Sequence, residues 1–280
     1  MHYQSVEVNC NTDYVEILIA ELAALGFTTF QESDNGLGFA AFTDENVEVD
    51  RAVLESLFDK YKTASALNYQ VSQIKKENWN ADWEKNYEPI VVENKILVRA
   101  HFHQPQPNML FDIIVTPKMS FGTGHHETTH QLLAMLLPIE IDGKEVLDAG
   151  CGTGILGILA MKKGAKTVEA YDIDEWAVEN SKENFSLNKI EEADYSIWQG
   201  DVLSVPDKRY DIIIANINRN ILMEDIQYLH KKLKPAGLLL LSGFYEKDVK
   251  DISLEAGKYE LHLTGKRIKN DWAAVCFKQH

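Results

Sequence analysis

Three glycines alternate with small residues directly after an apolar run, and this is where the sequence first indicates chemistry. The run is Val146-Leu147, and Asp148 follows it. The glycines stand at alternate positions: Gly150, Gly152 and Gly154. Glycine lets the chain turn sharply and lets a ligand approach backbone amides that a side chain would cover. The segment therefore predicts a strand, a ligand-binding turn and then a helix.

Two nucleotide cofactors fit this turn, and the register of the strand separates them. Residues 152–157 also match G-x-G-x-x-G, and Asp172 lies about 20 residues further on, as a dinucleotide site requires. That reading places Asp148 and Gly150 inside a buried parallel strand, where both are unfavourable. The alternative ends the strand at Asp148 or Ala149, so that Asp148 braces the loop and residues 150–154 wrap the ligand. This D-x-G-x-G-x-G pattern resembles the S-adenosylmethionine loop of class I methyltransferases.

Acidic residues end the next two predicted strands. Asp172 comes first after an apolar run and can accept both ribose hydroxyls of a nucleoside, whereas Asp174 suits the cap of the helix from Glu175. Asp201 follows Gly200, and its carboxylate could accept a hydrogen bond from an adenine amino group. An aspartate after glycine is equally often a plain turn residue. Because parallel strands end at one edge of a sheet, we expect these carboxylates to lie near the glycine turn.

Asn216 is the predicted catalytic residue. It ends an apolar strand, Asp211–Asn216, at the edge where function collects in a parallel sheet. Its amide oxygen can accept a hydrogen bond from an amine, which would orient the nitrogen lone pair along a methyl–sulfur axis. The competing role is a helix N-cap, but Asn218 suits that cap better.

The segment His126-Glu-Thr-Thr-His130 matches the zinc-protease pattern H-E-x-x-H. It follows the glycine-rich turn Phe121–Gly124 and is expected to open a helix rather than lie within one. No third ligand follows at a suitable place, because residues 139–146 already belong to the next strand unit. Paired threonines at a helix start, here ending with Thr129, can instead bind a ligand above the sheet. We therefore predict no metal site, and a zinc hydrolase remains the less favoured reading.

Periodicity predicts two domains of unequal size. Residues 1–74 have the order β-α-β-β-α-β of a small α+β ferredoxin-like domain, with a turn at residues 33–36. Residues 75–89 are polar and aromatic and are expected to form a linker. From residue 90 to 280, strands near 145, 167, 195, 211 and 237 alternate with helices. This predicts the α/β class with a doubly wound, mostly parallel sheet, closed by two antiparallel strands within residues 259–278.

The composition is that of a soluble, acidic protein. The chain has 280 residues, a formal net charge of −15 and three widely spaced cysteines, which gives no disulfide or metal pattern. No apolar run is long enough to span a membrane, and the first residues do not resemble a secretory signal. We expect a cytoplasmic protein that is a monomer. The negative charge disfavours nucleic acid and favours basic partners, although it also simply maintains solubility.

Several segments together resemble the PrmA family, the methyltransferases of ribosomal protein L11. They are the block Met119–Thr129, the glycine loop, Tyr171–Asp174, Ala215–Ile217 and the pair Asp271-Trp272. The resemblance covers about residues 78–278, and only the architecture agrees over the first 75. Two departures are Glu127, where the family often has proline, and Arg219, whose charge near the substrate mouth has no role that the sequence explains.

The resemblance implies a protein N-methyltransferase that moves methyl groups from S-adenosylmethionine to lysine or terminal amines of ribosomal protein L11. Thr129, Gly150, Asp172 and Asn216 would contact the cofactor or frame its methyl group, and Phe121 and Gly122 would help close the site. The first domain would recognise the ribosomal protein. The complete predicted cofactor set is Phe121, Gly122, Thr129, Asp148, Gly150, Gly152, Gly154, Asp172, Asp201 and Asn216. An RNA or small-molecule methyltransferase with the same core, or a non-catalytic cofactor-binding protein of the ribosome, stays open.

Overall fold

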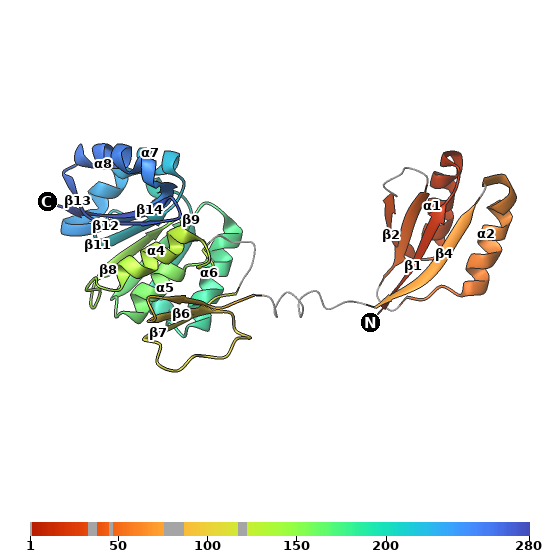
Figure 1. Ribbon diagram of the computed structural model, residues 1–280, viewed down its shortest axis with the longest axis horizontal. Helices are drawn as coiled ribbons and strands as arrows, with labels where there is room; N and C mark the ends of the chain where they lie inside the picture. The colour runs from red at the N-terminus through yellow and green to blue at the C-terminus, as the bar shows by residue number, and fades with distance from the viewer. Residues whose placement is uncertain (1, 33–37, 45–46, 66, 76–86, 117–121) are drawn as a thin grey trace. The chain divides into compact units, whose positions relative to one another are not determined.

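The computed structural model describes residues 2–32, 38–44, 47–65, 67–75, 87–116 and 122–280 (Figure 1). The chain divides into two units, Met1–Asn86 and Tyr87–His280, each with most of its contacts inside itself. The division falls within the stretch expected to be a linker, of which residues 76–86 lie outside the described residues, as does the predicted turn at 33–36. Phe121 lies outside them too.

The first unit has the predicted order of elements. Its four strands form an antiparallel sheet in the order β2-β3-β1-β4. The elements are β1 (His2–Asn9), α1 (Val15–Ala24), β2 (Phe27–Glu32), β3 (Gly38–Thr43), α2 (Arg51–Ser65) and β4 (Asn68–Lys75). A short 3₁₀ turn, Thr12–Tyr14, precedes α1. Asn11 stands at the N-cap position of this turn and makes no side-chain cap bond.

Alternating and helical spacings give this unit its own core. Val6 and Val8 point from β1 to one face of the sheet, as residues two apart on a strand must. Leu18 and Leu22 of α1, four residues apart, cover that face together with Leu54 and Phe58 of α2, and all are buried. Every residue of this hydrophobic cluster comes from the first unit.

The second unit contains a seven-stranded sheet in the order β10-β9-β8-β11-β12-β14-β13. The first five strands are parallel, and β14 and β13 are antiparallel, as the repeats and the tail predict. The strands are β8 (Glu145–Ala149), β9 (Thr167–Asp172), β10 (Tyr195–Gln199), β11 (Tyr210–Asn216), β12 (Leu233–Tyr245), β13 (Leu261–Lys269) and β14 (Trp272–Gln279).

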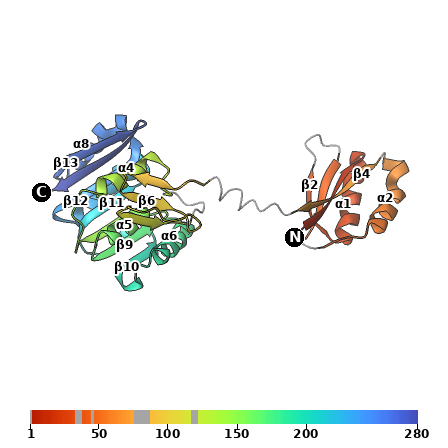
Figure 2. The ribbon, with the colours of Figure 1, turned by 60° about the horizontal axis from the view of Figure 1, so that its bottom comes forward.

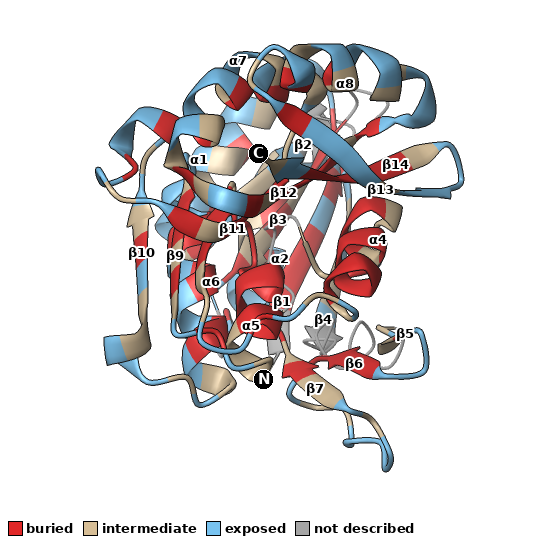
Figure 3. Cartoon of the chain, turned by 90° about the vertical axis from the view of Figure 1, so that its left-hand side faces the viewer, coloured by how far each residue is buried: buried red, intermediate tan, exposed pale blue. Residues whose placement is uncertain are grey.

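Helices cover both faces of this sheet (Figures 1 and 2). They are α4 (Glu127–Leu136), α5 (Ile155–Lys162), α6 (Glu175–Leu187), α7 (Arg219–Leu229) and α8 (Val249–Gly257). The strands sort their residues between the two faces: Val146 packs in one cluster with α4, α5 and α6, whereas Leu147 packs in the other with α7 and α8. In Figure 3 helices α4 and α5 are mostly buried, whereas α7 and α8 present exposed outer faces. The fold is therefore doubly wound, as predicted.

Two features of this unit were not foreseen in detail. A separate three-stranded sheet consists of β5 (Ile90–Val92), β6 (Ile96–Arg99) and β7 (Phe111–Ile114). Strand β12 is longer than the predicted 237–242, because its far end pairs with β14 and its first residue pairs with Tyr210. Across the part of the chain that the structure describes, no helix is both long and apolar enough to cross a membrane.

Candidate functional site

A cavity of about 840 Å³ opens at the carboxyl ends of β8, β9, β10 and β11. Its size is that of a site for a cofactor-sized ligand. Most residues predicted for the cofactor line it: Gly122, Thr129, Gly150, Gly152, Asp172, Asp201 and Asn216. Asp148 and Gly154 lie outside its lining. The parallel strands thus bring together residues that are nearly 100 positions apart in the sequence.

The glycine turn has the conformation that its sequence requires. Gly150, Gly152 and Gly154 have φ values of +68°, +54° and +75°, a left-handed region that favours glycine. A Cβ atom on Gly150 would lie 2.2 Å from Cγ2 of Ile217, so a side chain there would also clash with the loop after β11. The amides of Gly150 and Cys151 donate to the carbonyl of Tyr171, at 2.9 and 3.0 Å.

Two carboxylates hold this turn. Asp172 Oδ2 accepts a hydrogen bond of 2.8 Å from the Gly152 amide, and its Oδ1 accepts one of 3.1 Å from the Asp174 amide. Asp172 still faces the cavity. Asp148 is 1% exposed and accepts a 3.0 Å bond from the Gly157 amide, which ties the strand to the first turn of α5. Burial raises the pKa of Asp148 to about 7. Asp148 therefore braces the loop, while Gly154 forms the N-cap position of α5.

Asn216 and Thr129 meet across the cavity although 87 residues separate them. The Asn216 Nδ2 group donates to Thr129 Oγ1 at 3.1 Å, and Thr129 is itself fully buried at the start of α4. The amide oxygen of Asn216 is buried and has no hydrogen-bond partner among the described residues. A buried acceptor without a donor is costly, so its position in the cavity wall indicates that a ligand supplies the donor.

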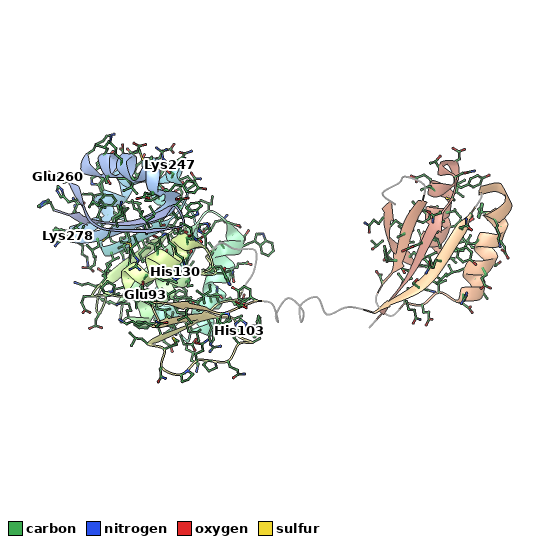
Figure 4. All side chains as sticks on the ribbon, viewed as in Figure 1. Glu93, His103, His130, Lys247, Glu260 and Lys278 are labelled. Carbon is green, nitrogen blue, oxygen red and sulfur yellow. The ribbon has the colours of Figure 1, made fainter. Side chains whose placement is uncertain are left out.

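The H-E-x-x-H segment opens a helix, as expected. His126 is the N-cap of α4, and its Nδ1 atom accepts a 3.3 Å bond from the Thr128 amide. Glu127 accepts a 2.9 Å bond from Asn270, so the departure from proline contributes a tie to the β13–β14 turn. His130, labelled in Figure 4, is partly buried, which together with Lys269 lowers its pKa. No group of three His, Cys, Asp or Glu side chains within the described ranges could hold a metal ion.

Charge in the cavity has one sign. Four carboxylates line it, those of Asp172, Asp201, Glu224 and Asp225, and no lysine or arginine among the described residues does. Asp201 also caps the 3₁₀ turn η3 (Val202–Ser204), whose Leu203 and Ser204 amides donate to it. Both roles considered for Asp201 are thus compatible with its position. A cavity of this charge favours cations and disfavours a pyrophosphate.

Sequence reasoning missed one wall of the cavity. Helix α7 lines it with Ile221, Glu224, Asp225 and Tyr228, which lie at positions i, i+3, i+4 and i+7 of one helical face. The sequence does show acidic and apolar residues at helical spacing here. An ordinary solvent-exposed helix face has the same mixture of residue types, so this spacing alone did not indicate a cavity wall. Gly243 was also missed, and a Cβ atom there would lie 2.1 Å from the carbonyl oxygen of Ile217.

The start of α7 shows what Asn218 and Arg219 do in the fold. Asn218 accepts a 2.9 Å bond from the Asn220 amide and is the N-cap, as predicted. Arg219 pairs with Asp248 at 3.1 Å and with Asp251 at 2.9 Å, so its charge ties α7 to α8.

An aromatic wall completes the site. Trp272 lines the cavity, and its ring lies 4.7 Å from that of His126 and 4.2 Å from that of Tyr245. The Trp272 carbonyl accepts a 3.0 Å bond from Gln131 of α4, which fixes this strand start against the helix. The Gly122 carbonyl, also in the lining, accepts a 2.7 Å bond from the Thr153 hydroxyl of the glycine turn.

Comparisons with known proteins agree with this geometry. The sequence model of the family described as ribosomal protein L11 methyltransferase (PrmA) matches residues 3–280. A ribosomal protein L11 methyltransferase of Porphyromonas gingivalis is 42% identical over 97% of this chain and 92% of its own length. One of Bacteroides fragilis is 39% identical over 96% of this chain and 95% of its own.

A solved structure shows the same likeness. The crystal structure of a ribosomal protein L11 methylase from Lactobacillus delbrueckii subsp. bulgaricus superposes with a TM-score of 0.64 and 27% identity. The match covers 69% of this chain and all of that one. With a family match over nearly its whole length and relatives at about 40% identity, this chain belongs to the PrmA family of ribosomal protein L11 methyltransferases.

Proposed function

We propose that this protein transfers methyl groups from S-adenosylmethionine to amines of ribosomal protein L11. The observation that carries the proposal is a cavity whose described lining has four carboxylates and no lysine or arginine, beside an amide oxygen that lacks a donor. A sulfonium nucleoside and an amine substrate complement both features. A dinucleotide would bring a pyrophosphate into the same negative field.

The residues present fit this cofactor. The amides of the glycine turn and Thr129 would face its amino-acid part, Asp172 its ribose and Asp201 its adenine. S-adenosylmethionine supplies a methyl group on a positively charged sulfur, which is already a good leaving group. The main task of the protein is therefore to hold the acceptor amine in line with the methyl group and to prevent unproductive orientations of the amine.

Asn216 would orient the acceptor amine. Its Nδ2 group donates to Thr129, which fixes the orientation of the amide in the cavity wall. A lysine amine is almost entirely protonated at neutral pH, since its ordinary pKa is about 10.4. We infer that the amine loses its proton to solvent, that Asn216 accepts one remaining N–H, and that the nitrogen lone pair forms the new bond to carbon as the carbon–sulfur bond breaks.

The finer assignments follow from the two units. We propose that the unit Met1–Asn86 recognises the ribosomal protein and that the unit Tyr87–His280 binds the cofactor. The protein would act in the cytoplasm as a monomer, without direct binding of nucleic acid. The net charge of −15 suits a basic protein substrate better than RNA.

One experiment separates this proposal from its alternatives. The purified protein is incubated with radiolabelled S-adenosylmethionine and either L11 or ribosomal RNA, and the methylated products are located by mass spectrometry. Label on amines of L11, which accumulates far more slowly with Asn216→Ala, is the expected result. Label on RNA would favour the RNA methyltransferase, and binding of a nicotinamide dinucleotide without binding of S-adenosylmethionine would overturn the proposal.

A further inference from the structure

One end of the cavity is formed by acidic side chains from two neighbouring elements. Asp201 stands directly before η3, and α7, which carries Glu224 and Asp225, packs against η3. All three carboxylates line the cavity, and no ion pair involves any of them among the described residues. The Tyr171 hydroxyl lies at the same end. We call this part of the lining, made up of Asp201, Asp225 and the Tyr171 hydroxyl, the acidic end of the cavity.

The Tyr171 hydroxyl is the second sign of a ligand here. Tyr171 belongs to β9 and is only 3% exposed, yet it contributes to the cavity lining. Its hydroxyl oxygen is buried and has no hydrogen-bond partner among the described residues. Burial raises the pKa of this phenol most, and among the charges that raise it further those of Asp225 and Asp201 have the largest effect. A buried hydroxyl close to two carboxylates, with nothing bonded to it, marks a place where polar groups meet a ligand.

The surroundings of Asp225 disfavour the charged form of its carboxyl group. Its side chain is partly buried on α7 and forms no hydrogen bond among the described residues. Burial raises the pKa of Asp225 to about 6, and the charges of Asp201 and Glu224 add to this rise. If this carboxylate had a structural role, the protein would supply a hydrogen-bond donor to it. A carboxylate that binds a ligand instead receives its donor from that ligand.

The flanking residues indicate which part of a ligand reaches this end. Ile173 follows the ribose carboxylate Asp172 by one position, and Leu203 follows Asp201 by two. Both line the cavity, and their side chains are 70% and 68% exposed. Large apolar side chains left open beside a cavity suit the faces of a flat ring. With the ribose at Asp172, the next group of the nucleoside is its base, and the base therefore reaches the acidic end.

We propose that Asp225 is a further cofactor-binding residue, which together with Asp201 accepts hydrogen bonds from the two N–H groups of the adenine 6-amino group, and that the Tyr171 hydroxyl, unpartnered without the ligand, then donates its one hydrogen bond to one of these carboxylates. The proposal rests on the proposed function, because it takes the nucleoside of S-adenosylmethionine as the ligand. An amino group has two donors, and one carboxylate whose oxygen already caps η3 is a poor match for both. Asp225 supplies the second acceptor, so the acidic end selects adenine over a base with an oxygen at that position.

The test compares two ligands that differ at this one position. S-adenosylhomocysteine carries the 6-amino group, and S-inosylhomocysteine carries an oxygen there. Calorimetric titration of the full chain is expected to show the adenosine compound binding far more tightly to the wild type. Asp225→Asn should weaken that compound about tenfold, and the inosine compound should bind equally well or better, because the new amide can donate to oxygen. Tyr171→Phe should weaken the adenosine compound by a smaller factor.

A stability measurement separates binding from a structural role. Asp225→Asn removes a charge that burial and two neighbouring carboxylates disfavour, so the midpoint of thermal unfolding without ligand should stay or rise. The matched control is Asp207→Asn, an aspartate whose side chain is fully exposed outside the cavity lining. It should change neither affinity by more than about twofold.

The outcomes are distinct. Equal weakening of both compounds by Asp225→Asn, or no weakening of either, overturns the assignment of Asp225. An unchanged affinity for S-adenosylhomocysteine with a raised KM for L11 would assign this carboxylate to the protein substrate instead. If the wild type binds neither compound, the proposed function itself fails, and this inference fails with it.

Discussion

Asn216 combines two properties that are rarely found together in a polar side chain of a cavity wall. Its Nδ2 group is fixed by a hydrogen bond to the buried Thr129, while its oxygen is buried without a donor. The first property limits the freedom of the amide, and the second leaves its acceptor for a ligand. Positioning of this kind costs no reorganisation when the substrate binds, and it is a principal source of rate enhancement for a reaction with a good leaving group.

Asn216→Ala should therefore damage turnover more than cofactor binding. We expect kcat to fall roughly 100-fold, with the Kd of S-adenosylhomocysteine changed less than about threefold. Thr129→Val keeps the shape but removes the hydroxyl that holds the amide, and it should lower kcat by a smaller factor. At saturating S-adenosylmethionine, where the proposed contact of Thr129 with the cofactor no longer limits the rate, the double variant should be no slower than Asn216→Ala alone, because both changes then act through one amide. Near-normal turnover of Asn216→Ala would disprove the role of this residue.

The glycine turn allows a second test with a built-in control. Gly150 and Gly143 have nearly the same φ, +68° and +69°, but a Cβ atom on Gly150 would lie 2.2 Å from Ile217, whereas one on Gly143 would meet nothing within 4 Å. Gly143→Ala should lower the free energy of unfolding by about 1 kcal/mol, which is the cost of the backbone conformation alone. Gly150→Ala should cost more and should also weaken S-adenosylhomocysteine at least tenfold, measured by calorimetry. Equal effects of the two variants would show that the close approach of Ile217 is unimportant.

Several of the residues that sequence reasoning identified share one property, which is that they end an apolar strand. Asp172 and Asn216 are examples, because a parallel sheet places every strand end at one edge. Asp225 could not be found in this way. Its place in the cavity depends on how α7 is rotated against η3, and helical spacing alone does not distinguish the face of a helix that lines a cavity from one that meets solvent. Asp148 was identified as a brace, and its bond to Gly157 agrees with that interpretation.

The strands of the large sheet are tied together at their opposite ends, far from the cavity. Lys234 at the start of β12 donates to Glu145 of β8 at 2.7 Å and to Asp211 of β11 at 2.8 Å. Asp211 also accepts a 2.9 Å bond from the Glu145 amide. These bonds join residues near the starts of β8, β11 and β12, so they align these three strands and thereby the strand end that carries Asn216.

Lys234→Met should reduce stability in a pH-dependent way. The hydrogen bond from Lys234 lowers the pKa of Glu145 below its ordinary value of 4.5. A lowered carboxyl pKa contributes stability that is present above about pH 4.5 and is lost as the pH falls through the folded-state value. Because these side chains are partly exposed, we expect a loss of only about 1 kcal/mol at pH 7, which disappears toward pH 3. Denaturant unfolding at both pH values measures it. Lys258→Met should cost less, because it breaks only the pair of an exposed lysine with Glu255, three residues earlier in the same segment. A loss that is constant with pH would contradict this role.

Element types were predictable to different degrees, and the reasons are physical. The strand–helix alternation of residues 145–257 follows from short apolar runs separated by amphipathic stretches. The ends of β12 were not predictable, because pairing with β14 and with Tyr210 extends it beyond its apolar centre. The sheet β5-β6-β7 was not predictable as a separate unit, since three short strands give the same pattern in a large sheet as in a small one.

At the scale of the molecule, the two units have independent hydrophobic clusters. The first unit packs residues between Val6 and Leu67, and the second packs residues between Val92 and Phe277 in two clusters, one on each face of its sheet. No residue belongs to clusters of both units. The whole cavity, from Gly122 to Trp272, lies within the second unit. Cofactor binding and recognition of a protein substrate can therefore reside on separate units.

A chain that begins at Tyr87 should consequently keep one activity and lose the other. It retains both hydrophobic clusters of the large sheet and every residue of the cavity lining, so we expect it to bind S-adenosylhomocysteine within about threefold of the full chain by calorimetry. Its kcat/KM for ribosomal protein L11 should fall at least 100-fold, because the proposed recognition unit is missing and only the active site selects the acceptor. Adding the separate unit 1–86 in solution should restore little, since the covalent connection supplies the effective concentration. Full methylation of L11 by the shortened chain would show that recognition belongs to the second unit, and loss of cofactor binding would show that the two units do not function independently.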